Sequence, residues 1–103
     1  MGRIVGGFAT AHIMMSRGSA GDKGERVFAG MKEIGRRIRA LSPDVVVIIS
    51  SDHLYNYDLS IQAPFAIATD AHHQPFGDMS LPTDLLPGAA DFASGFVGFA
   101  AEH

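Results

Sequence analysis

The chain has 103 residues, of which 47% are hydrophobic and 18% charged, and this composition describes one globular domain at most and excludes a disordered chain. Its formal net charge of −3 does not indicate the basic surface that nucleic-acid-binding proteins carry. The sequence contains no cysteine, which excludes disulfides and thiolate metal sites. We find neither a secretory leader nor an apolar run of the roughly 18 residues that a membrane span needs, so we expect a cytoplasmic location and no membrane partner.

Residues 3–9 are expected to form the first strand, and His12 follows soon after its end. Gly6 and Gly7 weaken this strand and indicate that another group approaches its backbone closely on one side. The Gly- and Ser-rich loop at residues 16–24 lacks the pattern GxxxxGK[ST]. A phosphate-binding loop of that type is therefore excluded.

The most regular pattern in the chain predicts a helix over residues 22–41. Apolar side chains recur there at spacings of three and four, which places them in one stripe: Val27, Met31, Ile34, Ile38 and Leu41. Ser42 and Pro43 are expected to end this helix. The arginines near its end, Arg36, Arg37 and Arg39, are interpreted as a solvated face that complements the helix dipole, with an anion site as the alternative.

The central element is expected at residues 45–49, which are five consecutive β-branched residues. An unbroken apolar run of this kind is typical of a parallel strand that is buried on both faces. Asp52 and His53 come after Ser50 and Ser51, where the predicted stretch, residues 44–53, ends. Ligands of open α/β sheets bind beyond the carboxyl ends of the strands.

Residues 64–69 are a third strand candidate, and residues 70–88, rich in Pro and Gly, are expected to form a long loop. In this loop, His72 and His73 are interpreted as solvated, with a substrate or proton-transfer role as the alternative. From residue 89 the pattern predicts a helix with its apolar side chains near one face: Phe92, Phe96, Val97 and Phe99.

This alternation of strands and helices predicts the α/β class, with a parallel or mixed sheet flanked by helices. Only two or three strands are visible, and a small sheet would leave the Phe-rich last helix uncovered. We therefore interpret residues 1–103 as the N-terminal portion of a larger single domain.

His12 and His53 are the first candidates for chemistry, because each follows a predicted strand. The ends of neighbouring parallel strands lie about 5 Å apart, or about 10 Å apart with one strand between them, so both imidazoles can converge on one ion. Neutral imidazole suits Fe, Zn, Cu and Ni. From spacing alone, two incidental histidines are the alternative.

Asp52 and Tyr55 flank His53 and are candidates for supporting roles. Successive side chains of an extended segment point to opposite faces, so Asp52 is not expected to share the ion with His53. Asp52 either holds a ligand imidazole in place or satisfies the backbone donors of the following loop. Tyr55 and Tyr57 either line an aromatic substrate pocket or simply pack.

Three stretches of the sequence carry a resemblance to a known family: GGFATAHI at residues 6–13, PDVVVIISSDH at residues 43–53, and PFAIA at residues 64–68. With the long helix between the first two, they resemble the class III extradiol ring-cleavage dioxygenases, and most closely the β-subunit type of protocatechuate 4,5-dioxygenase. The resemblance runs over essentially the whole chain. It implies that residues 1–103 are the N-terminal part of an extradiol dioxygenase-like catalytic domain.

The resemblance implies that His12 and His53 are two of three protein ligands to Fe(II), with Zn or another divalent metal as the alternative. It implies a catechol-type aromatic substrate such as protocatechuate, O2 as co-substrate, and ring cleavage next to the diol. The family's third ligand, a glutamate, and its catalytic histidine are expected beyond residue 103. A homo-oligomer or a small helical partner subunit is also implied.

A different class of function stays open beside the enzymatic one. A catalytically inactive, truncated relative can serve as a binding or assembly subunit, associating through the apolar helix at residues 89–101. The sequence therefore leaves two hypotheses, a ring-cleaving oxidoreductase and an assembly protein of the same family.

Overall fold

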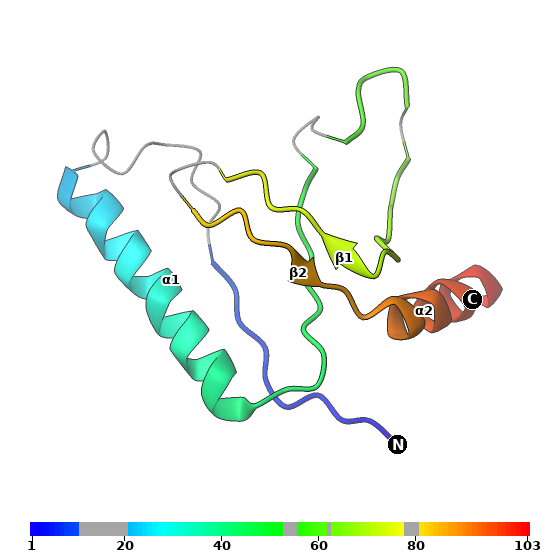
Figure 1. Ribbon diagram of the computed structural model, residues 1–103, viewed down its shortest axis with the longest axis horizontal. Coiled ribbons are helices and arrows are strands. Elements are labelled where there is room, and N and C mark those ends of the chain that lie inside the picture. Colours follow the sequence, from blue (N-terminus) through cyan, green and yellow to red (C-terminus); the bar gives the residue numbers. More distant parts are fainter. Residues whose placement is uncertain (11–20, 53–55, 62, 78–80) are drawn as a thin grey trace. The chain divides into compact units, whose positions relative to one another are not determined.

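The computed structural model describes residues 1–10, 21–52, 56–61, 63–77 and 81–103. The chain divides into two compact units, Met1–Val46 and Val47–His103. The first unit contains helix α1 (Gly21–Leu41), and the second contains strands β1 (His72–His73) and β2 (Leu86–Pro87) and helix α2 (Ala90–Glu102) (Figure 1).

Helix α1 confirms the helix predicted at residues 22–41, and its predicted apolar stripe is its more buried face. Val27, Met31, Ile34 and Ile38 are half-buried, whereas Leu41 at the end is exposed. The helix ends as expected at Ser42, whose backbone has a φ of 46° and whose N–H donates to the carbonyl oxygen of Arg39 at 3.1 Å. Pro43 follows and prevents continuation.

The arginines of α1 form a local ion-pair network. The carboxylate of Glu33 accepts bonds from Arg36 Nε and Nη2, both at 2.7 Å, and from Arg37 Nε at 2.8 Å. These partners lie three and four residues along the helix, the spacing at which helical side chains meet. The network agrees with the interpretation of this face as solvated surface.

Gly6 confirms the expected close approach to the first segment. A Cβ at Gly6 would lie 2.7 Å from Leu41 Cδ1, whereas a Cβ at Gly7 would meet nothing within 4 Å. An open pocket beside this contact is lined by Arg3, Ile4, Val5 and Leu41. The first of the two glycines therefore lets the N-terminal segment reach the end of α1.

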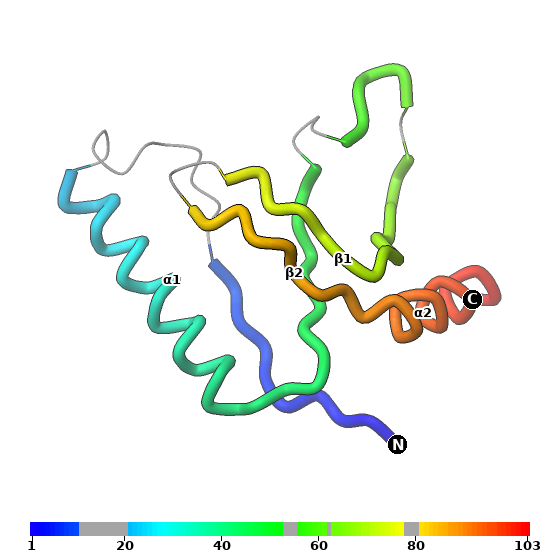
Figure 2. The backbone as a smooth tube through the Cα atoms, in the orientation of Figure 1, coloured from blue at the N-terminus to red at the C-terminus, as the bar shows by residue number. Residues whose placement is uncertain are grey.

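Residues 70–88 are not the open loop that the sequence predicted, because β1 and β2 pair within them. The strands are antiparallel, with His72 opposite Pro87 and His73 opposite Leu86, and they lie side by side in Figure 2. The N–H of Gly88 donates to the carbonyl oxygen of Ala71 at 2.8 Å, and Gln74 Nε2 donates to that of Thr83 at 2.7 Å. These bonds close a hairpin.

The predicted strands at residues 3–9, 45–49 and 64–69 are wrong for this structure. None of these ranges is in a sheet, and the one sheet of the described residues, the antiparallel pair β1–β2, is too small to confirm a parallel or mixed sheet. β-Branched residues form a strand only where a neighbouring backbone pairs with them and side chains cover them. Here Ile48 and Ile49 are 82% and 95% exposed. Two helices and a small sheet remain compatible with part of an α/β fold.

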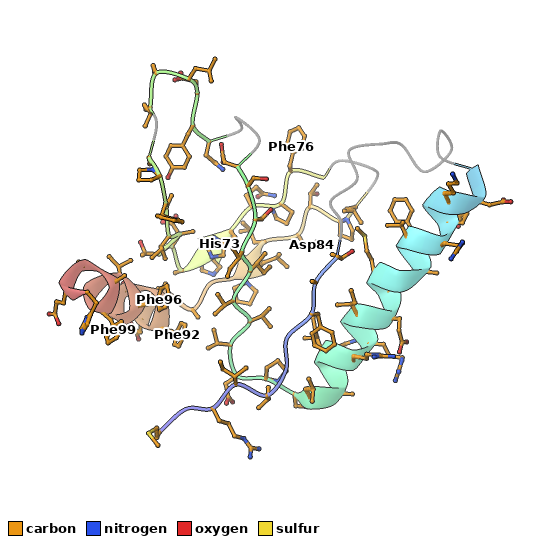
Figure 3. All side chains as sticks on the ribbon, turned by 180° about the vertical axis from the view of Figure 1, so that it is seen from behind. His73, Phe76, Asp84, Phe92, Phe96 and Phe99 are labelled. Atoms are coloured by element: carbon orange, nitrogen blue, oxygen red, sulfur yellow. The ribbon has the colours of Figure 1, made fainter. Side chains whose placement is uncertain are left out.

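Helix α2 confirms the helix predicted from residue 89. Three phenylalanines project from it (Figure 3), and Phe92, Phe96 and Phe99 are 51%, 50% and 62% exposed. At its end, the ring of His103 stacks on Phe99 with a centroid distance of 4.3 Å. Among the described residues, no helix has both the length and the apolar character that crossing a membrane requires.

We predict that Gly88→Ala opens the β1–β2 hairpin. A Cβ at this position would overlap the carbonyl oxygen of Asp70 and lie 2.8 Å from His73 Nε2, so the backbone has to move. Overpacking of this kind costs about 1–3 kcal/mol. Hydrogen exchange of the residue 88 amide should therefore accelerate by roughly tenfold or more.

The matched control for this substitution is Gly95→Ala in α2. A Cβ there meets nothing within 4 Å, and alanine is the better helix former by about 1 kcal/mol. Gly95→Ala should leave exchange at residue 88 unchanged and slow exchange within α2. Equal exchange at residue 88 in the wild type and in Gly88→Ala would show that the hairpin tolerates the methyl group.

The Glu33 network predicts a pH dependence of α1. Hydrogen bonds from Arg36 first, and then from Arg37, lower the pKa of Glu33 from 4.5 to about 2. A carboxyl pKa that is lower in the folded state stabilises the fold above pH 4.5, and the effect disappears as the pH falls toward 2. Because the groups are exposed, salt should weaken the effect.

An NMR titration of the Glu33 side-chain carboxyl carbon measures this pKa directly. We expect a midpoint near 2 in the wild type and one near the ordinary glutamate value in Arg36→Gln/Arg37→Gln. Identical midpoints in the two proteins would show that the ion pairs do not persist in solution.

Candidate functional site

The predicted site is centred on the segment after residue 47, in the second unit. Residues 47–52 lead to it without regular secondary structure. His12, His53 and Tyr55 lie outside the described residues, so the expected convergence of the two imidazoles stays a prediction. Asp52 lies within the described residues and is half-buried.

The carboxylate of Asp52 accepts hydrogen bonds from the chain on the far side of His53. The backbone N–H of Asn56 lies 3.1 Å from Oδ1 and 3.0 Å from Oδ2, and Asn56 Nδ2 donates to Oδ1 at 2.7 Å. The backbone N–H of Tyr57 donates to Oδ2 at 3.0 Å. One carboxylate thus accepts bonds from three N–H donors, and we call this group of contacts the Asp52 clamp.

The Asp52 clamp confirms one of the two roles expected for Asp52. Its carboxylate satisfies backbone donors four and five residues further on, which is a common use of Asp at the start of a loop. A role in holding a ligand imidazole was the other expectation and stays a prediction. Both roles are compatible, because residue 53 lies between the two ends that the clamp joins.

A second carboxylate shapes the chain directly after the clamp. Asp58 Oδ1 accepts bonds from the hydroxyl of Ser60 and, at 2.7 Å, from the Ser60 backbone N–H. Its carbonyl oxygen accepts from the N–H of Ile61 at 3.2 Å. The hydroxyl bond, followed by the backbone bonds of Ser60 and Ile61, lowers the pKa of Asp58. The bonds from Ser60 therefore favour the ionised form of this carboxyl group.

The paired histidines are strand residues rather than parts of an open loop. His72 is exposed and His73 is half-buried, and His73 is labelled at the hairpin in Figure 3. Their strand also brings His73 Nε2 close to Gly88. The structure therefore gives His73 a packing role that the sequence did not predict. The substrate or proton-transfer alternative remains untested.

Within the described ranges, no three His, Asp or Glu side chains gather in a way that could hold a metal ion. The two predicted ligands are not among those residues. The side chain of Tyr57 is exposed, and its backbone rather than its ring contributes to the clamp. The described part of the site thus consists of Asp52 and its hydrogen-bond partners Asn56 and Tyr57.

Sequence reasoning missed Asn56. It contributes two of the three donors of the Asp52 clamp, yet the segment at residues 54–61 carried no secondary-structure pattern. The signal that could have found it is local: an Asp that starts a loop, with an Asn four residues later. Asp and Asn pair in this way because one supplies acceptors and the other an amide donor.

Comparison with known proteins finds one matching family model and a similar curated protein. Residues 8–95 match the family model described as the catalytic LigB subunit of aromatic ring-opening dioxygenase. A Mycobacterium ulcerans (strain Agy99) protein, 2,3-dihydroxyphenylpropionate/2,3-dihydroxicinnamic acid 1,2-dioxygenase, is 34% identical over an alignment of 79 residues that covers 72% of this chain and 24% of that relative. The chain thus spans about a quarter of the length of this curated relative. No solved structure matches it significantly.

Proposed function

This chain belongs to the family of catalytic LigB subunits of aromatic ring-opening dioxygenases, and on that premise we propose that the protein takes part in extradiol cleavage of a catechol-type aromatic. The observation that carries the proposal is the family match, which spans residues 8–95. His12, Asp52, His53 and Tyr55 all lie inside that range. The family match therefore agrees with the resemblance that the sequence showed at residues 6–13, 43–53 and 64–68.

We propose Fe(II) as the cofactor, with His12 and His53 as two of its protein ligands. The donor chemistry fits, because imidazole is a ligand that Fe(II) accepts in non-haem oxygenases. The carboxylate of Asp52 already accepts hydrogen bonds from three N–H donors, which supports a role next to the metal site and not as a metal ligand. When bound, Fe(II) would supply the redox chemistry that lets O2 react with an aromatic ring.

The chain's own residues would fix the cofactor and orient the substrate. His12 and His53 would hold the iron from two separate segments, and Asp52 would support His53 without binding the iron itself. We propose that Tyr55 lies near the aromatic ring of the substrate. In the reaction, one ring carbon–carbon bond next to the diol breaks, and both atoms of O2 enter the ring-opened product.

The substrate class is proposed as a catechol that carries a carboxylate, such as protocatechuate. The name of the M. ulcerans relative supports this class, since both compounds in it are dihydroxylated aromatics with a carboxylic acid. Zn or another divalent ion is the alternative cofactor, because imidazole ligands alone do not select iron. A cytoplasmic location and a homo-oligomer or small helical partner subunit remain parts of the proposal.

A second candidate is an assembly function within the same family. The exposed phenylalanines of α2 favour it, because rows of aromatic side chains are common at protein–protein contacts. In that case the chain would associate with a second copy of itself through Phe92, Phe96 and Phe99. Ring cleavage by this chain is not required for such a role.

We predict that His12→Ala and His53→Ala each reduce ring cleavage by at least about a hundredfold and weaken Fe(II) binding. Loss of one of few protein ligands weakens the site and misplaces the substrate. The assay follows the yellow ring-opened product of a catechol such as 3,4-dihydroxybenzoate, with iron content measured on the same samples. The matched control is His72→Ala, an exposed histidine of β1 that should retain activity. Normal turnover in both ligand variants would refute the proposed function.

The assembly candidate predicts a concentration-dependent molar mass in light scattering. Phe96→Ser should shift the protein toward the monomer, because it removes the central ring of the exposed row. Ala101→Ser on the same helix is the control and should leave the mass unchanged. A constant monomer mass in the wild type at all concentrations would count against self-association.

A further inference from the structure

We propose that residues 44–50 pair with the same residues of a second copy of this chain, as two antiparallel strands related by a two-fold axis at Val47. This contact goes beyond the proposed function, because it is separate from the aromatic row of α2 and does not depend on ring cleavage. All seven residues belong to the described part of the chain. Their exposure, their unpaired backbone and the charges near their ends support the contact.

Residues 45–49 expose apolar side chains. Four of the five are exposed to solvent: Val46, Val47, Ile48 and Ile49. Because successive side chains of an extended segment point to opposite faces, Val46 and Ile48 would lie on one face of a strand, and Val47 and Ile49 on the other. Apolar side chains on either face lower the free energy when a neighbouring strand removes them from water.

The backbone of the same five residues is available for pairing. In the described part of the chain, residues 45–49 belong to no helix or sheet, and no hydrogen bond joins their backbone to another described residue. A β-branched run with unpaired backbone groups is a template to which another chain adds a strand. Only an extended polypeptide supplies N–H and C=O groups at the matching spacing, so a lipid surface or an apolar small molecule does not fit this segment.

A second copy of the chain matches this segment in length and polarity. The run at residues 45–49 contains no charged residue, proline or glycine, which is typical of short segments that associate with identical segments of other chains. Pairs of β-branched side chains across two strands suit a sheet. A dimer with two-fold symmetry is also the commonest oligomer, and in it both subunits contribute the same surface.

Two carboxylates decide the direction and the register of the pair. Asp44 precedes the run and Asp52 follows it. Parallel strands in register would place each Asp beside its counterpart, and an antiparallel pair centred on Ile48 would place Asp44 opposite Asp52. Both arrangements bring like charges together, which is unfavourable. A pair centred on Val47 instead places Asp44 opposite Ser50 of the partner subunit, whose hydroxyl is a hydrogen-bond donor.

The two-fold axis makes Val47 its own partner. Val47→Lys places two ammonium groups opposite each other, and Val47→Glu places two carboxylates there, so each variant alone should associate about tenfold or more weakly than the wild type. An equal mixture of the two variants should associate again, because lysine then faces glutamate. Val47→Thr is the matched control. It keeps an uncharged, β-branched side chain and should stay within a few fold of the wild type.

The test is light scattering of the purified full chain over a range of concentrations, with backbone hydrogen exchange measured on the same samples. We expect the molar mass to rise toward that of a dimer. Amide exchange should slow by roughly tenfold or more at alternate residues of 45–49, since every second residue of an antiparallel strand bonds to its neighbour. Exchange of the Gly88 amide, whose N–H bonds to Ala71, reports whether the variants keep the hairpin.

Four results would overturn the contact. A constant monomer mass with fast exchange at residues 45–49 would show that the segment stays unpaired. Slow exchange that does not depend on concentration would show that the same polypeptide covers it. Association that survives Val47→Lys and disappears in Phe96→Ser would place the contact on α2. Failure of the Val47→Lys and Val47→Glu mixture to associate would exclude the two-fold pair. None of these results bears on ring cleavage, which the activity of the ligand variants tests separately.

Discussion

The interaction on which the candidate site depends is the capture of three N–H donors by the carboxylate of Asp52. Backbone N–H groups need acceptors wherever no helix or sheet supplies them, and Asn56 and Tyr57 lie in neither. A carboxylate is suited to this task because its two oxygens accept several bonds at once. The same carboxylate is thereby committed to shaping the chain, which leaves metal binding to the neighbouring imidazole in our proposal.

Local polar contacts of this kind recur throughout the described part of the chain. Glu33 binds two arginines within one turn of α1, and Asp58 holds the turn at Ser60. The hairpin adds a longer connection, from Gly88 to Ala71. By contrast, none of the described hydrophobic side chains is fully buried. Most of these polar contacts are therefore close in sequence, whereas Gly6 against Leu41 and the hairpin at Gly88 join segments that are far apart in the chain.

Two apolar segments of the chain keep most of their side chains exposed to solvent. Residues 45–49 are strongly β-forming, and α2 carries three exposed aromatic rings. Apolar side chains lower the free energy of a fold only when other atoms remove them from water.

The sequence by itself determined both helices, their apolar faces, the stop at Ser42 and Pro43, and the family. Helix signals are local, since hydrogen bonds and side-chain spacing within a few residues decide them. A close approach at Gly6 or Gly7 was also foreseen, because glycine in an extended segment indicates it, and the structure showed that Leu41 makes it at Gly6. Only the tertiary structure decided which backbone pairs with which: β-branched residues 45–49 remained outside a sheet, whereas His72 and His73 entered one. The role of Asn56 was decided in the same way, because a hydrogen bond depends on where two groups meet in space, and periodicity does not record that.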